Sequence, residues 1–377
     1  MIALLLLVIE TLDGLAQNSQ GGLWISPAEL AQLKMEGMHW KRLKSQAQAP
    51  AGSPNLSDQD QKNNVYVLAK ALVYARCRLE SAHVQCIDIP LESLHDEVVS
   101  QVMSAMGTET GGRTLALGRK LAAYVIAADL VGLPPDKDQI FQSWLHDVRR
   151  KILAGEKTLI ATHEERPNNW GTMAGASRAA VAVYLKDTID LERTARVFKG
   201  WLGDRSTYAG FKYGELSWQC DPSKPVGINP KGCIRAGHSI DGVLSDDQRR
   251  SGTFTWPPPH ENYVYEALQG AIVQAVILHR AGYDPFNWAD KALLRAYQWL
   301  RTEANFSAKG DDTWQLPLVD CFYDTHLWDG GLTSTGKNIG WTGWTHAQRG
   351  GCVRDRAGAA ITVPTPQDLR ITSPREQ

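Results

Sequence analysis

Helical patterning dominates this chain of 377 residues. Stretches with apolar residues at helical spacing follow one another, mostly separated by short turns rich in Gly, Pro and Asp. Alternating strand patterns are scarce. Repeated helices over this length predict an all-α fold, either a solenoid or helix pairs closed into a toroid, and the lack of a residue-level repeat disfavours the solenoid. The expected helices cover residues 60–79, 92–107, 137–153, 171–185, 189–203, 262–282 and 286–303, with another around residues 121–128 that Leu133-Pro134-Pro135 ends.

Residues Ser26 to Glu29 predict an additional helix near the beginning of the chain. Ser26 can cap the helix, Pro27 suits its first position, and Glu29 can reach back to complete a capping box. We expect this helix to run toward Gln46.

The ends of the chain differ in composition from its middle. Residues 2–9 are apolar and small residues follow around Ala16, which is typical of a secretory signal peptide. A buried first helix is the alternative, since the run is too short to span a bilayer. We expect a signal peptide at residues 1–16, one domain at residues 17–362 and a disordered tail at residues 363–377.

The charge balance and the cysteines limit the possible partners and compartment. With 40 basic and 41 acidic residues, no global charge favours nucleic acid or a membrane surface, and we expect a secreted monomer. The six cysteines fit an oxidising compartment, and no Cys-x-x-Cys spacing suggests zinc, so we expect neither metal nor cofactor. Among 15 possible connectivities, near-neighbour pairing joins Cys77 to Cys86, Cys220 to Cys233 and Cys321 to Cys352.

Two regions, residues 204–261 and 308–377, interrupt the helical pattern and are too long for plain connectors. Long ordered loops often carry function. Tryptophan rings can cover the C–H faces of sugars, so Trp170, Trp218 and Trp256 are candidates for a carbohydrate cleft, with packing as the alternative. The polar and aromatic candidates in the first region are Lys212, Tyr213, Trp218, His238, Arg249, Arg250, Trp256 and His260.

Paired asparagines precede one of the expected helices. Asn168 and Asn169 lie beside Arg166 and Trp170, and Asn is a favoured helix cap. A cap accounts for one asparagine only. The amide of Asn169 can instead donate to a carboxylate, assisted by the positive end of the helix.

Tyr263 lies in the first turn of the apolar helix expected at residues 262–282. Nearby cations and the helix terminus would favour its phenolate form. A buried tyrosine with a satisfied hydroxyl is the alternative interpretation.

At these two places the chain resembles polysaccharide lyases of the alginate-lyase type. The matching motifs are "NNWG" at residues 168–171 and "YVYEALQ" at residues 263–269. The resemblance implies an (α/α) toroid, an incomplete barrel of six or seven helical hairpins with long loops over the cleft. It implies β-elimination on an anionic polysaccharide of 1,4-linked uronates, such as glucuronan or alginate. Asn169 would then neutralise the uronate carboxylate and Tyr263 would act as base and acid.

The chain departs from the better-known relatives at two positions. They have histidine where Trp170 stands, and arginine where Trp256 stands. His238 and either Arg249 or Arg250 are the candidates to replace these groups, and we expect His238 and Arg249 to be catalytic. The resulting substrate-binding candidates are Trp170, Arg166, Lys212, Tyr213, Trp218, Arg250, Trp256 and His260.

Two other functions fit the sequence. A glycoside hydrolase on a similar toroid would need two carboxylates about 5 Å or about 6.5–9.5 Å apart, depending on stereochemistry. A non-catalytic carbohydrate-binding protein would bind oligouronides without turnover. The candidate carboxylates for hydrolysis are Asp241, Asp246, Asp247, Glu215 and Glu261.

Overall fold

The structure, a computed structural model, describes residues 22–81 and 85–354. The signal peptide expected at residues 1–16 and the tail expected at residues 363–377 lie outside these ranges. Within them, helices dominate and the only paired strands form one short hairpin, so the expected all-α fold is confirmed. No helix in the described ranges is long and apolar enough to cross a membrane.

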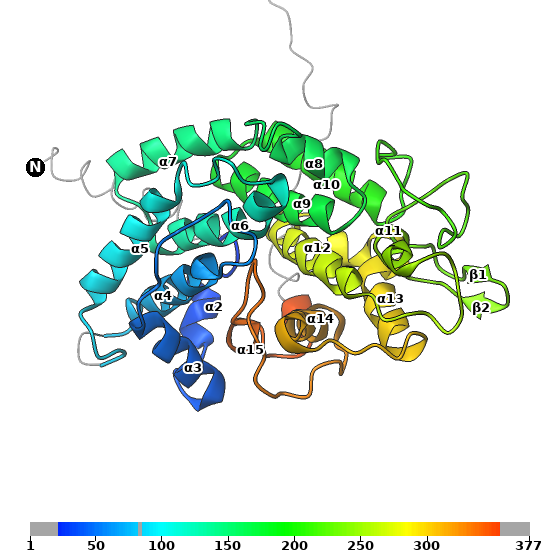
Figure 1. The fold of residues 1–377 in the computed structure, drawn as a ribbon. Helices are drawn as coiled ribbons and strands as arrows, with labels where there is room; N and C mark the ends of the chain where they lie inside the picture. Colours follow the sequence, from blue (N-terminus) through cyan, green and yellow to red (C-terminus); the bar gives the residue numbers. More distant parts are fainter. Residues whose placement is uncertain (1–21, 82–84, 355–377) are drawn as a thin grey trace, which may run out of the picture.

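Four long helices stand side by side in the middle of the fold (Figure 1). α6 packs between α4 and α9, and α9 packs against α12. Buried residues cover most faces of all four, as expected of helices with neighbours on every side. These inner helices are α4 (Asn63–Cys77), α6 (Thr114–Val131), α9 (Asn169–Tyr184) and α12 (Asn262–Arg280).

Helices with one buried face lie outside this row and alternate with it along the chain. Along the chain, each outer helix precedes an inner one: α3 precedes α4, α5 precedes α6, α7 precedes α9, α10 precedes α12, and α13 precedes α14 (Gln315–Tyr323). The described residues thus contain five such pairs, against the six or seven expected, and residues 204–261 form mostly loops. The outer helices are α3 (Gly37–Gln48), α5 (Leu91–Ala105), α7 (Pro135–Val148), α10 (Thr188–Trp201) and α13 (Trp288–Thr302).

The last helices return to the first. α14 (Gln315–Tyr323) packs on α12 and on α15 (Thr342–Thr345), and α15 packs on α3. The indole N–H groups of Trp341 and Trp344 donate to the carbonyl oxygens of Val65 (2.9 Å) and Lys34 (3.0 Å). The helices therefore form a ring, the toroidal arrangement expected from the sequence (Figure 1).

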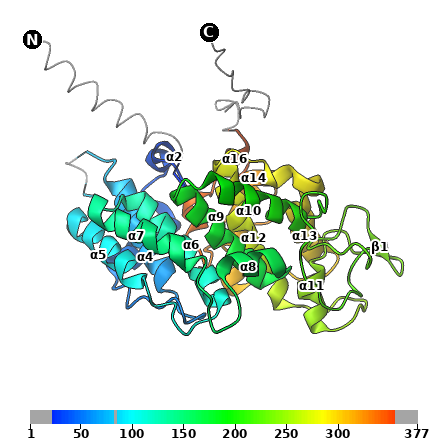
Figure 2. The same cartoon turned by 90° about the horizontal axis from the view of Figure 1, so that it is seen from above.

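The remaining elements are short. α8 and α11 lie toward the face of the ring opposite to α2 and α16 (Figure 2). The short helices are α2 (Pro27–Gln32), α8 (Leu159–Glu165), α11 (Ser245–Gln248) and α16 (Gly351–Arg354), and the strands are β1 (Ile234–Arg235) and β2 (His238–Ser239). The 3-10 turns are η1 (Arg249–Ser251), η2 (Pro285–Asn287) and η3 (Gly310–Asp312).

The first helix begins as predicted but ends early. Ser26 and Glu29 form the capping box, with Pro27 in the first turn. The helix stops at Gln32 and a second one starts at Gly37, so the continuous helix expected up to Gln46 is wrong. The break has a local cause, since Leu33 is extended and Gly37 has a φ of 82°, which favours glycine.

The three disulfides are those predicted. Cys77 bonds to Cys86, Cys220 to Cys233 and Cys321 to Cys352. The second lies within the long loop region and the third ties α14 to α16. The second therefore cross-links a segment without long helices, and the third reinforces the packing of α14 on α16.

Candidate active site

Asn168 is the cap of α9. Its side-chain oxygen accepts from the backbone N–H of Trp170 at 3.2 Å, and its amide nitrogen donates to Asp246 at 2.9 Å. The capping role expected for this asparagine is confirmed.

Asn169 lies beneath the surface, with no exposed area. Its backbone N–H donates to Asp247 at 3.0 Å, and its amide nitrogen donates to Oε2 of Glu266 at 2.9 Å. Its amide oxygen accepts from Nη1 of Arg250 at 3.3 Å. Because a carboxylate only accepts and a guanidinium only donates, these two partners define the orientation of the amide.

Tyr263 lies in the first turn of α12, where Glu261 accepts a hydrogen bond from its backbone N–H at 3.1 Å. Tyr263 is partly exposed, with 38% of its surface accessible to solvent. The guanidinium of Arg250 lies 3.7 Å from its ring centre. Arg250 thus contacts both Tyr263 and Asn169, and we refer to Asn169, Arg250, Tyr263 and Glu266 as the Tyr263 cluster.

A pocket of about 340 Å³ adjoins this cluster. Glu266 belongs to both, and we call the cavity the Glu266 pocket. Its volume is in the range of small-molecule sites. The pocket is lined by Arg119, Met173, Asn262, Glu266, Gln269, Phe306, Lys309, Gly310, Asp311, Asp312 and Lys337.

Both positively and negatively charged side chains line the Glu266 pocket. Nη2 of Arg119 donates to Oε2 of Glu266, and Lys337 pairs with Asp60 outside the pocket at 2.7 Å. Burial raises the pKa of Asp312 to about 7, with Asp311 and Glu266 adding to the shift, although a hydrogen bond from Gln269 opposes it. One of its acids is therefore partly protonated near neutral pH, which lowers the negative charge facing an anionic ligand.

Arg249, the neighbour of Arg250 in the chain, does not contact the Tyr263 cluster in the same way, because it pairs with Asp246. Its Nε donates to the buried carboxylate of Asp246 at 2.7 Å, which raises the pKa of Arg249 further. The backbone N–H of Gly214 also donates to Asp246 at 2.9 Å. Arg249 thus supports the loop under α9, while Arg250 contacts Tyr263 and Asn169.

The histidine candidates do not touch Tyr263 or Asn169 in the described ranges. His238 in β2 stacks on Trp256 with ring centres 4.3 Å apart. His260 stacks on Phe306 at 4.5 Å, and its Nε2 lies 3.1 Å from the carbonyl oxygen of Ala304. Since Phe306 lines the Glu266 pocket, His260 lies at the pocket's edge, whereas the structure does not bring His238 into the cluster.

A third group of candidates lies along α8 and the segment after α10. The guanidinium of Arg166 lies 5.2 Å from the Trp170 ring centre, and Lys212 pairs with Glu165 at 2.6 Å. Tyr213 is half-buried, and burial raises its pKa. None of these side chains lines the Glu266 pocket.

Trp218 corrects an expectation. It has no exposed area, and its indole N–H donates to the carbonyl oxygen of Gly252 at 3.0 Å. A ring enclosed on all sides cannot lie against a sugar, so the prediction that Trp218 contacts substrate is wrong. It is a core residue of the loop region.

The five carboxylates considered for hydrolysis do not line the Glu266 pocket. Asp246 and Asp247 are buried under the start of α9, and burial raises the pKa of Asp247 well above its usual value. Asp241 pairs with Arg295, Glu215 accepts from Ser217, and Glu261 accepts from the backbone N–H of Tyr263. Their interactions are those of structural groups.

Sequence reasoning missed Glu266 and Arg119. Glu266 is the one acid within α12, and Arg119 interrupts the apolar sequence of α6. A charged residue inside a helix that is otherwise buried on every face needs a partner. The need for a partner could be read from the sequence, but the identity of the partner could not, because α6 also carries Lys120 and Asp129. Lys309, Lys337 and Asp312 carried no such signal because they lie in polar loops.

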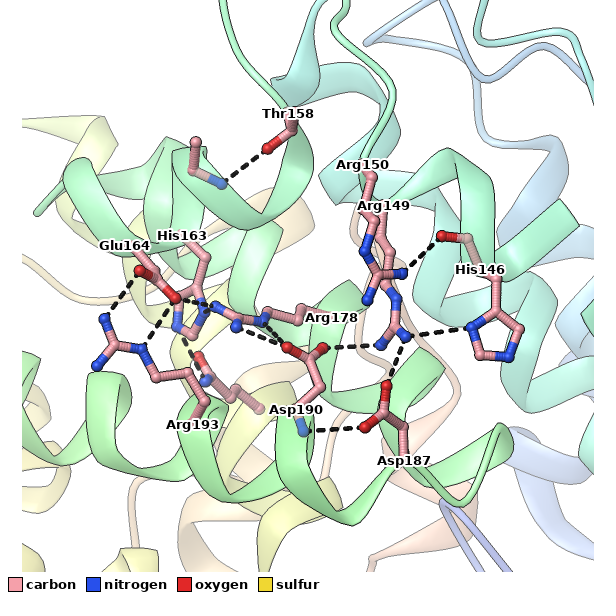
Figure 3. A network of polar contacts seen from close by, with 12 residues as sticks. His146, Arg149, Arg150, Thr158, His163, Glu164, Arg178, Asp187, Asp190 and Arg193 are labelled. Atoms are coloured by element: carbon pink, nitrogen blue, oxygen red, sulfur yellow. Dashed lines mark hydrogen bonds and ion pairs between the residues drawn. The ribbon is translucent and has the colours of Figure 1, made fainter. Parts of the chain in front are cut away.

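A network of ion pairs and hydrogen bonds connects α8, α9 and α10 (Figure 3). Arg178 of α9 donates to Asp190 at 2.7 Å and to Glu164 at 3.0 Å. Arg149 donates to the other oxygen of Asp190 at 2.9 Å. Burial lowers the pKa of His163 well below its usual value, with nearby Arg178 adding to the effect, so this histidine is neutral. The network joins α8, α9 and α10 and fixes the position from which Asn169 projects.

No group of three or more His, Cys, Asp or Glu residues in the described ranges is arranged to hold a metal ion. The candidate chemistry consists of a phenol, an arginine and an amide.

Comparison with known proteins identifies a related family. The family model described as alginate lyase matches residues 101–216, from within α5 to the segment after α10. The match includes Asn169 and Arg119 but ends before Arg250 and Tyr263. Comparisons with curated proteins and with solved structures gave no match.

Proposed function

We propose that this chain, which matches the alginate lyase family model over residues 101–216, is a polysaccharide lyase that cleaves a 1,4-linked polyuronate such as glucuronan or alginate by β-elimination. The observation that carries this proposal is the position of Arg250, 3.7 Å from the ring centre of Tyr263 and hydrogen-bonded to Asn169. A partly exposed phenol beside a cation is what the reaction needs.

The reaction removes a proton from C5 of a uronate next to its carboxylate. Tyr263, as phenolate, takes this proton, the electrons form the C4=C5 double bond, and the C4–O4 bond breaks. The same phenol then gives a proton to O4, as in a syn elimination. Arg250 supplies positive charge beside the group that must become negative.

The negative charge that develops on the uronate carboxylate also needs stabilisation. In the proposal Arg250, which is exposed, contacts this carboxylate, and the cations of the Glu266 pocket attract the rest of the anionic chain. Asn169 has no exposed area, so its proposed role changes from direct donor to the group that orients Arg250.

We also propose that the protein is secreted. Three disulfides are typical of an oxidising compartment, and an anionic polysaccharide of this kind is an extracellular polymer.

The test is incubation of the protein with glucuronan, alginate and pectate. Elimination produces ultraviolet absorbance from the unsaturated uronate at the new non-reducing end, and Tyr263→Phe should abolish it while the helical circular dichroism stays the same. New reducing ends without this absorbance would indicate hydrolysis and overturn the proposal. Full activity of Tyr263→Phe would overturn the role of the tyrosine.

A further inference from the structure

A second cavity, of about 410 Å³, lies beside the Glu266 pocket. The segment of residues 306–313 separates them: Phe306 and residues 309–312 line the Glu266 pocket, whereas Ser307, Ala308 and Thr313 line the second cavity. This segment is held where it starts, since the backbone N–H of Phe306 donates to Leu300 at 2.7 Å and its carbonyl accepts from the Tyr265 hydroxyl at 2.7 Å.

Both cavities occupy the same end of the inner helices. Asn262 and Glu266, in the first turns of α12, line the Glu266 pocket, and Tyr265 between them lines the second cavity. Leu316 brings in the first turn of α14. A polymer that passes Tyr263 and the Glu266 pocket can therefore continue across the segment of residues 306–313 into the second cavity, which we call the Trp328 pocket.

The lining of the Trp328 pocket suits a sugar ring. Trp328 contributes the accessible aromatic surface, since Tyr265 (3% exposed) and Tyr297 (2% exposed) are buried in the pocket wall, and Ser307 and Thr313 contribute hydroxyl groups. The Tyr265 and Tyr297 hydroxyls donate to the carbonyl oxygen of Phe306 and to Gln315, both at 2.7 Å, so these two residues shape the pocket wall and leave Trp328 as the ring that a sugar can cover. Apolar faces combined with a few polar groups are the usual composition of a carbohydrate subsite.

The charges of the Trp328 pocket are balanced. Arg301 and Asp329 are the charged residues that line it. Nη1 of Arg301 donates to the carbonyl oxygen of His326 at 2.9 Å, and the side chain is exposed at the pocket. Asp329 accepts from the backbone N–H of Gly331 at 2.9 Å. An exposed arginine with a planar fork of donors matches a carboxylate.

Trp328 is held in position before any ligand arrives. The buried carboxylate of Asp320 accepts from the backbone N–H groups of Leu327 (2.8 Å) and Trp328 (3.0 Å). The indole N–H of Trp328 donates to Gly331 at 3.0 Å. A fixed ring loses little conformational entropy on binding, which favours a recognition role over simple exposure of a loop residue.

We propose that the Trp328 pocket is a second uronate-binding subsite, in which the sugar ring lies against Trp328 and its carboxylate contacts Arg301. This inference rests on the proposed function, because the ligand is the same polyuronate whose cleavage takes place at Tyr263. It predicts that the protein binds long oligouronides more tightly than short ones.

The test measures binding by calorimetry in the Tyr263→Phe background, so that ligands are not cleaved. Glucuronan oligosaccharides from the disaccharide to the octasaccharide are the probes. Trp328→Ala and Arg301→Met should each weaken octasaccharide binding about tenfold, equivalent to about 1.4 kcal/mol, while disaccharide binding stays unchanged. Trp328→Phe should retain most of the affinity. Trp144→Ala, a half-buried tryptophan on the outer helix α7, is the matched control.

Failure of the inference and failure of the proposed function give different results. Octasaccharide binding that is equally tight in Tyr263→Phe alone and in Tyr263→Phe combined with Trp328→Ala or Arg301→Met would overturn the subsite while leaving the lyase reaction in place. Absence of any oligouronide binding, together with no unsaturated product from the wild type, would overturn both. Because Arg301 is exposed, Arg301→Met tests the subsite even where Trp328→Ala disturbs its loop.

Discussion

The guanidinium of Arg250 lies 3.7 Å from the ring centre of Tyr263. The two residues come from different elements, η1 and the first turn of α12, and the loop of residues 252–261 joins these elements. Arg250 is also hydrogen-bonded to Asn169 at the start of α9, so one side chain connects both motifs that the sequence singled out. The chemistry assigned to Tyr263 depends on this contact.

Arg250→Met and Arg249→Met form a matched pair. Loss of Arg250 should lower kcat by at least about 100-fold, the usual effect of removing a group that stabilises developing charge, with a smaller loss of stability than in the Arg249 variant because Arg250 is exposed. Loss of Arg249 should destabilise the fold by about 1–3 kcal/mol, because buried Asp246 loses a donor. Turnover on polyuronate and thermal unfolding measure the two effects. Equal losses of kcat in both variants, with equal stability, would contradict the different roles of the two arginines.

Glu266→Gln tests whether the amide of Asn169 must be oriented. The substitution keeps the size of the side chain but removes the negative charge that Arg119 and Asn169 share. We expect kcat to fall between about 10-fold and about 100-fold as Arg250 loses its fixed position, with a smaller change in KM. Steady-state kinetics should be compared with Glu192→Gln, an exposed residue on α10. Wild-type kcat in Glu266→Gln would show that this orientation is not needed.

Asp312 should make substrate binding depend on pH near neutrality. Its pKa is raised to about 7, so it loses its proton as pH rises through that value and adds negative charge beside Glu266 and Asp311. The KM for an anionic polymer should therefore rise between about pH 6 and about pH 8, and Asp312→Asn should lessen the rise.

The same group affects stability in a predictable direction. Because its folded-state pKa lies above the unfolded value, its contribution to stability is lost as pH rises from about 4 to about 7. Asp312→Asn should be more stable than wild type above that window and equal to it below. Urea unfolding at several pH values provides this comparison, and an Asp312→Asn protein with the wild-type pH profile would contradict the assignment.

Glu29 and Arg280 should contribute to stability at neutral pH and lose that contribution in acid. Burial alone would raise the pKa of Glu29, but hydrogen bonds and charge from Arg280, together with Ser26, lower it to about 2. The stabilisation is fully present above the unfolded pKa of about 4.5 and is lost as pH falls toward about 2.

Glu29→Gln should reduce the free energy of unfolding by about 1–2 kcal/mol at pH 7, after allowance for solvent screening. The difference from wild type should disappear at about pH 2. Glu36→Gln is the control, because its ion pair with Lys34 is largely exposed, and it should leave stability nearly unchanged. A Glu29→Gln difference that persists undiminished at low pH would contradict the linkage.

Local features of the sequence predicted well where the cause of structure is local. Ser26 and Glu29 define a helix start through bonds three residues apart, and Asn168 caps α9 in the same way. The break at Leu33 to Glu36 was missed because the apolar spacing continues across it. Disulfide partners were predicted from proximity in the chain, a rule that works when the closed loops are short.

The candidate site depends on contacts that the sequence did not specify. Tyr263 and Asn169 are brought together, but Arg250 rather than Arg249 joins them, and the two differ by one position in a short turn. No periodicity distinguishes neighbours in a loop. Trp218 looked like a ligand contact because polar residues surround it in sequence, yet the loop folds back over it and encloses it.

The sequence by itself determined that the chain is helical, where most helices lie, and which motifs could carry a lyase reaction, because apolar spacing, caps and short motifs act over a few residues. Only the tertiary structure decided that Glu266 of α12 meets Arg119 of α6, and that Asn169 lies buried beneath Arg250. It also decided that the segment of residues 306–313 divides two neighbouring cavities. These relationships depend on helices far apart in the chain packing into one ring, since burial and charge pairing are properties of that packing and not of any single segment.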